Sequence, residues 1–161
     1  MARGTACDDA PVTEAPQFRQ ARSAELTAAE LYALLRLRVD VFVVEQNCPY
    51  PELDGRDLEP GTVHLWYAAD DGSALATIRV LENGADRAIG RVATALSARG
   101  RGLSALLIRR GIELCEGRTI DIGAQAYLEG WYERFGFRRS GPDYVEDGIP
   151  HLPMRLPGTV S

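Results

Sequence analysis

The sequence of 161 residues contains no lysine, because all 18 of its basic residues are arginine. A P-loop needs a lysine after its last glycine to reach the bound phosphates, so this class of nucleotide site is excluded. The chain also lacks any apolar run close to the roughly 18 residues of a membrane span. The net charge of -5 argues against nucleic acid as a partner. We therefore expect neither a membrane nor a nucleic-acid partner.

Cysteine and histidine are scarce. The three cysteines, Cys7, Cys48 and Cys115, form no C-x-x-C pair, and their odd number argues against a structural disulfide or a zinc site. His64 and His151 add no metal-ligand spacing, so we expect no metal. Cys48 lies in a polar loop where a nucleophile is conceivable, but no histidine lies near it in the sequence to activate the thiol. The cytoplasm is the simplest location for such a chain.

The length and composition are those of one globular domain. A chain of 161 residues with 45% hydrophobic and 25% charged residues can bury one core. Residues 1–16 lack the apolar centre of a signal peptide, and we expect them to form a disordered leader. Residues 17–161 are expected to form the single domain.

Hydrophobic periodicity predicts a mixed α/β fold, in the order β-αα-βββ-α-β-α-ββ, with one parallel crossover in the middle of the sheet. The capping box at residues 27–30 opens the first helix, which is followed by a short second one. The expected strands are 18–22, 64–69, 74–81, 88–94, 119–123, 137–144 and 150–156; the expected helices are 27–37, 39–44, 103–114 and 127–135.

The most informative segment is RGRGLS, residues 99–104, between an apolar strand and an amphipathic helix. Gly100 and Gly102 let the backbone turn tightly and approach a ligand. The following helix presents unpaired N–H groups and the positive end of its dipole. Arg99 and Arg101 add positive charge. The segment favours a phosphate or pyrophosphate site, and a flexible helix entry without a ligand is the alternative.

Two phosphate-binding patterns fit this segment. The dinucleotide fingerprint G-x-G-x-x-G/A fits residues 100–105. Asp121 follows at a separation along the sequence that suits a ribose contact. However, residues 95–99 separate the fingerprint from the strand, and the rest of the chain supplies no repeated βαβ units. The pattern R/Q-x-x-G-x-G/A fits Arg99, Gly102 and Ser104, with serine in place of glycine or alanine at the last position. In this pattern the segment resembles the pyrophosphate loop of the GNAT superfamily of acyl-CoA N-acyltransferases.

The resemblance extends over residues 31–156. The blocks LYALLRLRVDVFVVEQNCPYPELDGRDL, IGRV, RGRGLS, GAQAYLEGWYERFGF and EDGIPH are each similar to segments of the ElaA-like branch. The resemblance implies the GNAT fold, in which the central parallel strands splay apart and acyl-CoA lies in the gap. It also implies an N-acetyltransferase that uses acetyl-CoA as co-substrate, without a metal, and transfers the acetyl group directly.

The same resemblance assigns candidate site residues. Backbone groups of Val92 and Thr94 would contact the acetyl and pantetheine portions of acetyl-CoA. Tyr132, in the block WYERF, occupies the position of the general acid that protonates the departing thiolate, with a plain core residue as the alternative. The residues of the pyrophosphate loop would be Arg99, Gly100, Arg101, Gly102, Leu103 and Ser104.

The general base stays open at this point. Gly90 stands where many relatives carry a glutamate on the strand before the loop. Glu45 and His151 are favoured because they lie in the ElaA-like blocks VVEQNCPY and EDGIPH, and an amine that is already neutral would need no base. The full set of candidates is Glu45, Asp54, His64, Glu146 and His151.

The expected acceptor is a primary amine on a small molecule or a peptide. Polyamines, amino acids, antibiotic-like amines and protein N-termini all stay open. A non-catalytic acyl-CoA-binding regulatory module is the alternative function, and the sequence is compatible with a homodimer. Acidic residues crowd the expected acceptor side, which would suit a cationic amine, although a solvated loop explains them as well. They are Glu45, Glu52, Asp54, Asp57, Glu59, Asp143, Glu146 and Asp147.

Overall fold

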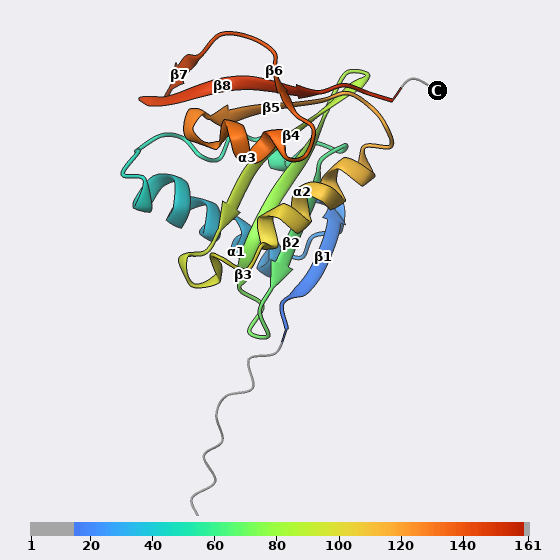
Figure 1. Cartoon of the computed structure of the whole chain (residues 1–161). Coiled ribbons are helices and arrows are strands. Elements are labelled where there is room, and N and C mark those ends of the chain that lie inside the picture. Colours follow the sequence, from blue (N-terminus) through green and yellow to red (C-terminus); the bar gives the residue numbers. More distant parts are fainter. Residues whose placement is uncertain (1–14, 160–161) are drawn as a thin grey trace, which may run out of the picture.

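The computed structural model describes residues 15–159, and Figure 1 shows these residues as one twisted sheet flanked by helices. The sheet has eight strands in the order β1-β2-β3-β4-β5-β8-β6, with β7 paired to β8. Neighbouring strands are antiparallel except β4 and β5, which are parallel. The strands are β1 (Gln17–Arg22), β2 (Val63–Ala68), β3 (Ala74–Asn83), β4 (Asp86–Thr94), β5 (Ile120–Gln125), β6 (Arg138–Arg139), β7 (Tyr144–Glu146) and β8 (Ile149–Leu156).

Three α-helices accompany the sheet: α1 (Ala28–Arg38), α2 (Leu103–Leu114) and α3 (Glu129–Glu133). The predicted capping box at the start of α1 is confirmed. Thr27 Oγ1 accepts a hydrogen bond from the Glu30 amide at 3.1 Å, and the Glu30 carboxylate accepts one from the Thr27 amide at 2.9 Å. A π-helix, η2 (Val39–Glu45), continues α1 and carries the chain toward the carboxyl end of β4.

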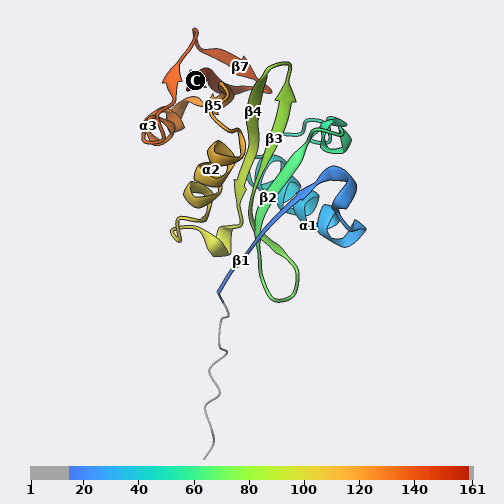
Figure 2. The ribbon, with the colours of Figure 1, turned by 90° about the vertical axis from the view of Figure 1, so that its right-hand side faces the viewer.

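The two long helices cover opposite faces of the sheet, as Figure 2 shows. The alternation of side chains along β2 explains this arrangement. Leu65 packs in the core cluster that contains Leu107 of α2, whereas its neighbour Trp66 packs in the cluster that contains Leu34 of α1. Both faces of the central strands are therefore buried, and the site must open at an end of the sheet or between strands.

The predicted order of elements is confirmed, with three local differences. The expected strand 137–144 is divided into β6 and β7, separated by Gly141 and by Pro142, which has no N–H to donate. The expected helix 127–135 is only a short 3-10 turn followed by α3. The expected strands 74–81 and 88–94 extend toward each other until only a tight turn separates them, since Asn83 pairs with Asp86 and Gly84 has a φ of 63°.

Residues 1–14, which include Cys7 and most of the expected leader, lie outside the described residues. Within residues 15–159, no helix is both long and apolar enough to cross a bilayer. The same residues hold no group of three or more His, Cys, Asp or Glu side chains that could bind a metal ion.

Candidate active site

A cavity of about 1000 Å³ opens where β4 and β5 diverge. The two strands pair only at Arg87 with Ile120 and at Ala88 with Asp121. Beyond this point β4 continues from Ile89 to Thr94 without β5 beside it, and all six of these residues line the cavity. The expected splaying of the central parallel strands is therefore confirmed. It leaves backbone groups of β4 facing the cavity instead of a neighbouring strand.

The segment RGRGLS forms the link between this edge of β4 and α2. Gly100 and Gly102 have φ values of 78° and 74°, which are left-handed conformations that glycine adopts without strain. Gly102 is the N-cap of α2 and has no side chain to cap the helix, so the first amides of α2 stay available to a ligand. A Cβ at either glycine would meet no protein atom within 4 Å. The loop has the conformation and the space that a pyrophosphate needs.

Ser104, the departure from the glycine or alanine of the family pattern, has a structural partner. Its hydroxyl is hydrogen-bonded to the hydroxyl of Thr94, which ties the end of β4 to the first turn of α2. Leu103 is buried with 6% exposure, so only its backbone is available to a ligand. Of the predicted cofactor residues, the cavity lining includes Val92, Thr94, Arg99 and Ser104.

Arg99 forms an ion pair across the cavity rim with Glu45, at the end of η2. Its Nη1 and Nη2 each lie 2.6 Å from a carboxylate oxygen of Glu45, and Nη2 lies 3.3 Å from the carbonyl oxygen of Thr94. The hydrogen bonds from Arg99 lower the pKa of Glu45. Glu45 is therefore an ionised, engaged carboxylate, which makes it a weak proton acceptor in the neutral range.

Tyr132 of α3 is buried with 5% exposure and lines the cavity. Its ring makes edge-to-face contacts with Trp131 and Phe137, at centroid distances of 4.8 and 6.1 Å. Burial raises the pKa of Tyr132, and its hydroxyl donates to no other group in the described part of the chain. The phenol therefore keeps its proton, and that proton is available to a ligand in the cavity.

His151 of β8 lies beside Gln125 at the carboxyl end of β5 and also lines the cavity. Its Nδ1 lies 2.7 Å from the carbonyl oxygen of Ile149, which can only accept, so Nδ1 carries the ring proton. In the neutral imidazole the lone pair is then on Nε2, 3.8 Å from a carboxylate oxygen of Glu146. The ring stacks on Tyr144, which restricts its orientation.

Of the other base candidates, Glu146 lines the cavity but its side chain is exposed on β7, and the rest are engaged or lie elsewhere. His64 is 1% exposed, is not among the cavity-lining residues, and its Nε2 lies 3.2 Å from the carbonyl of Asp57. Asp54 is bound by Arg79 through contacts of 2.8 and 2.7 Å, and these interactions lower its pKa despite partial burial. The thiol of Cys48 donates to the carbonyl of Asp147 at 3.1 Å. His151 is therefore the candidate base that the geometry supports best.

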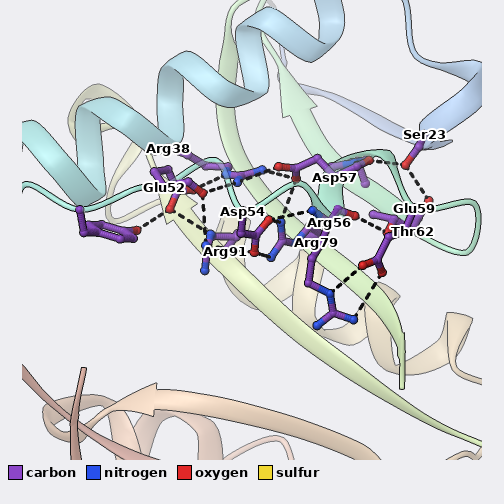
Figure 3. A network of polar contacts seen from close by, with 12 residues as sticks. Ser23, Arg38, Glu52, Asp54, Arg56, Asp57, Glu59, Thr62, Arg79 and Arg91 are labelled. Atoms are coloured by element: carbon purple, nitrogen blue, oxygen red, sulfur yellow. Dashed lines mark hydrogen bonds and ion pairs between the residues drawn. The ribbon is translucent and has the colours of Figure 1, made fainter. Parts of the chain in front are cut away.

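Most of the acidic residues that crowd the acceptor side are bound to arginines. Glu52 and Asp57 are 3% and 5% exposed, and both contact the fully buried Arg38, as Figure 3 shows. Arg38 Nε lies 2.5 Å from Glu52 Oε1, and Arg38 Nη1 lies 2.5 Å from Asp57 Oδ1. Arg79 joins the network at 3.0 Å from Asp57. These carboxylates hold residues 46–62 against the sheet and are not free to bind a cation.

Sequence reasoning missed this network, although a signal for it exists. Arg38 follows Leu34 by four residues and so shares the buried face of α1, and Arg79 interrupts the apolar run of β3. A charged residue at a core-facing position needs a buried partner of opposite charge. The acidic residues of the loop that follows α1 supply that partner.

A bulge in β4 brings a third arginine into the same network. Between Thr77 and Arg79, β3 has one residue where β4 has two, Arg91 and Val92. Arg91 has a φ of 52°, a left-handed conformation that costs an L-residue roughly 1–2 kcal/mol. Its Nε lies 2.9 Å from Glu52 Oε2, and its Nη2 lies 3.3 Å from Asp54 Oδ2.

Comparison with known proteins identifies the family. The model of the acetyltransferase (GNAT) domain matches residues 38–157. A UPF0039 protein of Mycobacterium tuberculosis is 45% identical over 152 residues, which cover 92% of this chain and 96% of that protein. The crystal structure of an acyl-CoA N-acyltransferase from Pseudomonas aeruginosa is 42% identical with a TM-score of 0.83, covering 88% and 99% of the two chains. That of Escherichia coli ElaA is 36% identical with a TM-score of 0.82, with the same coverage.

These findings confirm the fold expected from the pyrophosphate-loop pattern. They exclude the dinucleotide alternative, and Asp121 is in fact bound to Arg155 of β8 at 2.7 Å. The sheet, the splayed strands, the loop and the family model agree, and the chain belongs to the ElaA-like group of the GNAT acetyltransferase family.

Proposed function

We propose that this protein transfers an acetyl group from acetyl-CoA directly to a primary amine. The observation that carries the proposal is one cavity with three kinds of group on its lining. It has the open edge of β4 next to the pyrophosphate loop, a protonated phenol at Tyr132 and an imidazole lone pair at His151. A module that only bound acyl-CoA would need the first of these but neither of the others.

The reaction needs two proton movements, and the chain offers a group for each. The amine nitrogen attacks the thioester carbonyl carbon, the C–S bond breaks, and CoA leaves as a thiolate. His151 Nε2 accepts the proton that the amine gives up, and the Tyr132 hydroxyl stabilises the leaving sulfur by hydrogen bonding and proton donation. Backbone groups of Val92 and Thr94 hold the acetyl and pantetheine portions. The amides of residues 101–104 bind the pyrophosphate.

Two carboxylates favour a positively charged acceptor. Glu146 and Asp147 line the cavity beside His151, and within residues 15–159 neither forms an ion pair with an arginine. The acceptor is an amine of a small molecule or a peptide, held in its cationic form by these groups and deprotonated at His151.

Titration calorimetry with acetyl-CoA and with NADH tests the co-substrate. Acetyl-CoA should bind with one site per chain. NADH should give no binding heat, because the sheet has one parallel pair, β4 and β5, and lacks the repeated βαβ units of a dinucleotide-binding fold. An acceptor screen that follows release of the CoA thiol then separates an enzyme from a binding module. Binding of NADH without acetyl-CoA would contradict the proposal, and binding without turnover on any amine would favour the regulatory module.

Replacing Gly102 by glutamate should weaken acetyl-CoA binding at least tenfold, about 1.4 kcal/mol. The new side chain would occupy the open space beside the loop and place a negative charge where the pyrophosphate binds. Gly72→Glu is the matched control, because Gly72 also has a positive φ and open space but lies in the turn between β2 and β3. The dissociation constants of both variants are measured by calorimetry. Equal dissociation constants of the two variants for acetyl-CoA would show that the loop does not take part in binding.

A further inference from the structure

We propose that Arg91 is a positioning residue for acetyl transfer: its ion pairs with Glu52 and Asp54 hold the β4 bulge in the conformation that presents the backbone of β4 to the thioester. The inference rests on the proposed function. It assigns a role to a side chain that belongs neither to the pyrophosphate loop nor to the acid–base pair.

The first observation is the place of the bulge. Arg91 and Val92 lie opposite the single residue Ile78, in the part of β4 that has lost β5 as a neighbour. A bulge turns the following backbone groups relative to the rest of the strand. Here the groups that follow are those of Val92 and Ala93, which line the cavity.

The second observation is that arginine is a poor residue for this backbone. At φ 52° a bulge of this kind normally uses glycine, which has no Cβ to clash with the backbone. The arginine conformation persists only if the surroundings hold it. Figure 3 shows Arg91 reaching into the network at Glu52 and Asp54.

The third observation is that these partners are themselves fixed. Glu52 is 3% exposed and held by Arg38 of α1, and Asp54 is held by Arg79 of β3. Because Asp54 also lines the cavity, Arg91 connects the loop of residues 46–62 to strand β4. A displaced loop would change the bulge, and through it the polarisation of the thioester carbonyl.

The test compares Arg91→Ala with Arg91→Gly. Both lose the ion pairs, but only alanine keeps the Cβ that disfavours a left-handed residue. We expect Arg91→Ala to lower kcat roughly tenfold with acetyl-CoA affinity little changed, and Arg91→Gly to recover most of that loss. Arg91→Gln should behave as Arg91→Ala and replaces it if the alanine variant does not fold.

A second readout needs no acceptor. The infrared carbonyl band of bound [1-13C]acetyl-CoA should lie below that of the free compound in the wild type and in Arg91→Gly, and close to it in Arg91→Ala. The pair Glu116→Ala and Glu116→Gly is the control, since Glu116 also has a positive φ, of 51°, but lies after α2 on the surface. These two control variants should differ in stability but have the same kcat.

Three results separate the possible failures. Equal carbonyl bands and equal kcat in wild type, Arg91→Ala and Arg91→Gly would overturn the role of Arg91 while leaving the acetyltransferase proposal intact. Equal losses in the alanine and glycine variants would show that the charge acts without the bulge, and would also overturn it. A wild-type protein that does not bind acetyl-CoA would overturn the proposed function, and this inference with it.

Discussion

Replacing Tyr132 by phenylalanine should lower turnover by roughly 10²- to 10⁴-fold, the usual effect of losing a general acid. The affinity for acetyl-CoA should change little, because only one hydroxyl is removed and the ring contacts with Trp131 and Phe137 are kept. Measuring kcat by CoA thiol release and the dissociation constant by calorimetry separates the two effects.

The fold is expected to tolerate this change. The Tyr132 hydroxyl donates to no other group within residues 15–159, so its removal leaves no unpaired partner and should not lower the free energy of unfolding. Tyr67→Phe is the matched control, because Tyr67 lies on β2 and is not among the cavity-lining residues. Wild-type turnover in a folded Tyr132→Phe protein would return Tyr132 to a purely structural role.

Replacing His151 by alanine should have an effect of similar size, roughly 10²- to 10⁴-fold in kcat, together with a changed pH profile. In the wild type the rate should rise with pH, because general-base catalysis needs a proton acceptor that is itself unprotonated. The alanine variant should lose this rise, apart from any dependence that comes from the amine itself. Rate profiles from pH 5 to 9 on the best amine found would check this.

Glu45 provides the contrast for that experiment. Hydrogen bonding from Arg99 lowers the pKa of Glu45, so this carboxylate is already ionised below the neutral range and cannot produce a rise there. Glu45→Gln should therefore keep the shape of the profile and act mainly on KM. A flattened pH profile in Glu45→Gln, with an unchanged one in His151→Ala, would show that Glu45 and not His151 is the general base.

The space at Gly90 allows a rescue of the His151 variant. A Cβ at this position would meet no heavy atom within 4 Å, and Gly90 lines the cavity. Gly90→Glu in the His151→Ala background should restore part of the turnover, with its rise at lower pH because a carboxylate ordinarily loses its proton before an imidazole. Gly90→Gln in the same background is the control and should restore nothing.

The fold could be predicted from the sequence where local signals decide the structure. The helix at residues 103–114 has the predicted bounds, because its apolar periodicity begins directly after two glycines. The helix expected at 127–135 is shorter, since its aromatic residues are held by contacts with distant strands more than by helical propensity. Boundaries that depend on such contacts are not visible in a single sequence.

The sequence predicted several residues that line the cavity, but not the pairing of the charges around it. Glu45, Tyr132 and His151 come from three separate blocks, yet all three line the cavity. What the blocks did not reveal was which charges are already paired, because the partners Arg38 and Arg79 lie on α1 and β3. The roles of Tyr132 and His151 stay predictions until the variants are measured.

The arginine network has a further chemical consequence in a protein that takes up a reactive thioester. A lysine near the cavity could lose its proton, attack the acyl donor and become acetylated, which would remove its charge. Guanidinium groups stay protonated and do not act as nucleophiles near neutral pH. With Arg38, Arg79 and Arg91 as the cations behind the cavity, and with no lysine in the sequence, no side-chain amine competes with the acceptor. The cations of this site are therefore resistant to acetylation by its own acyl donor.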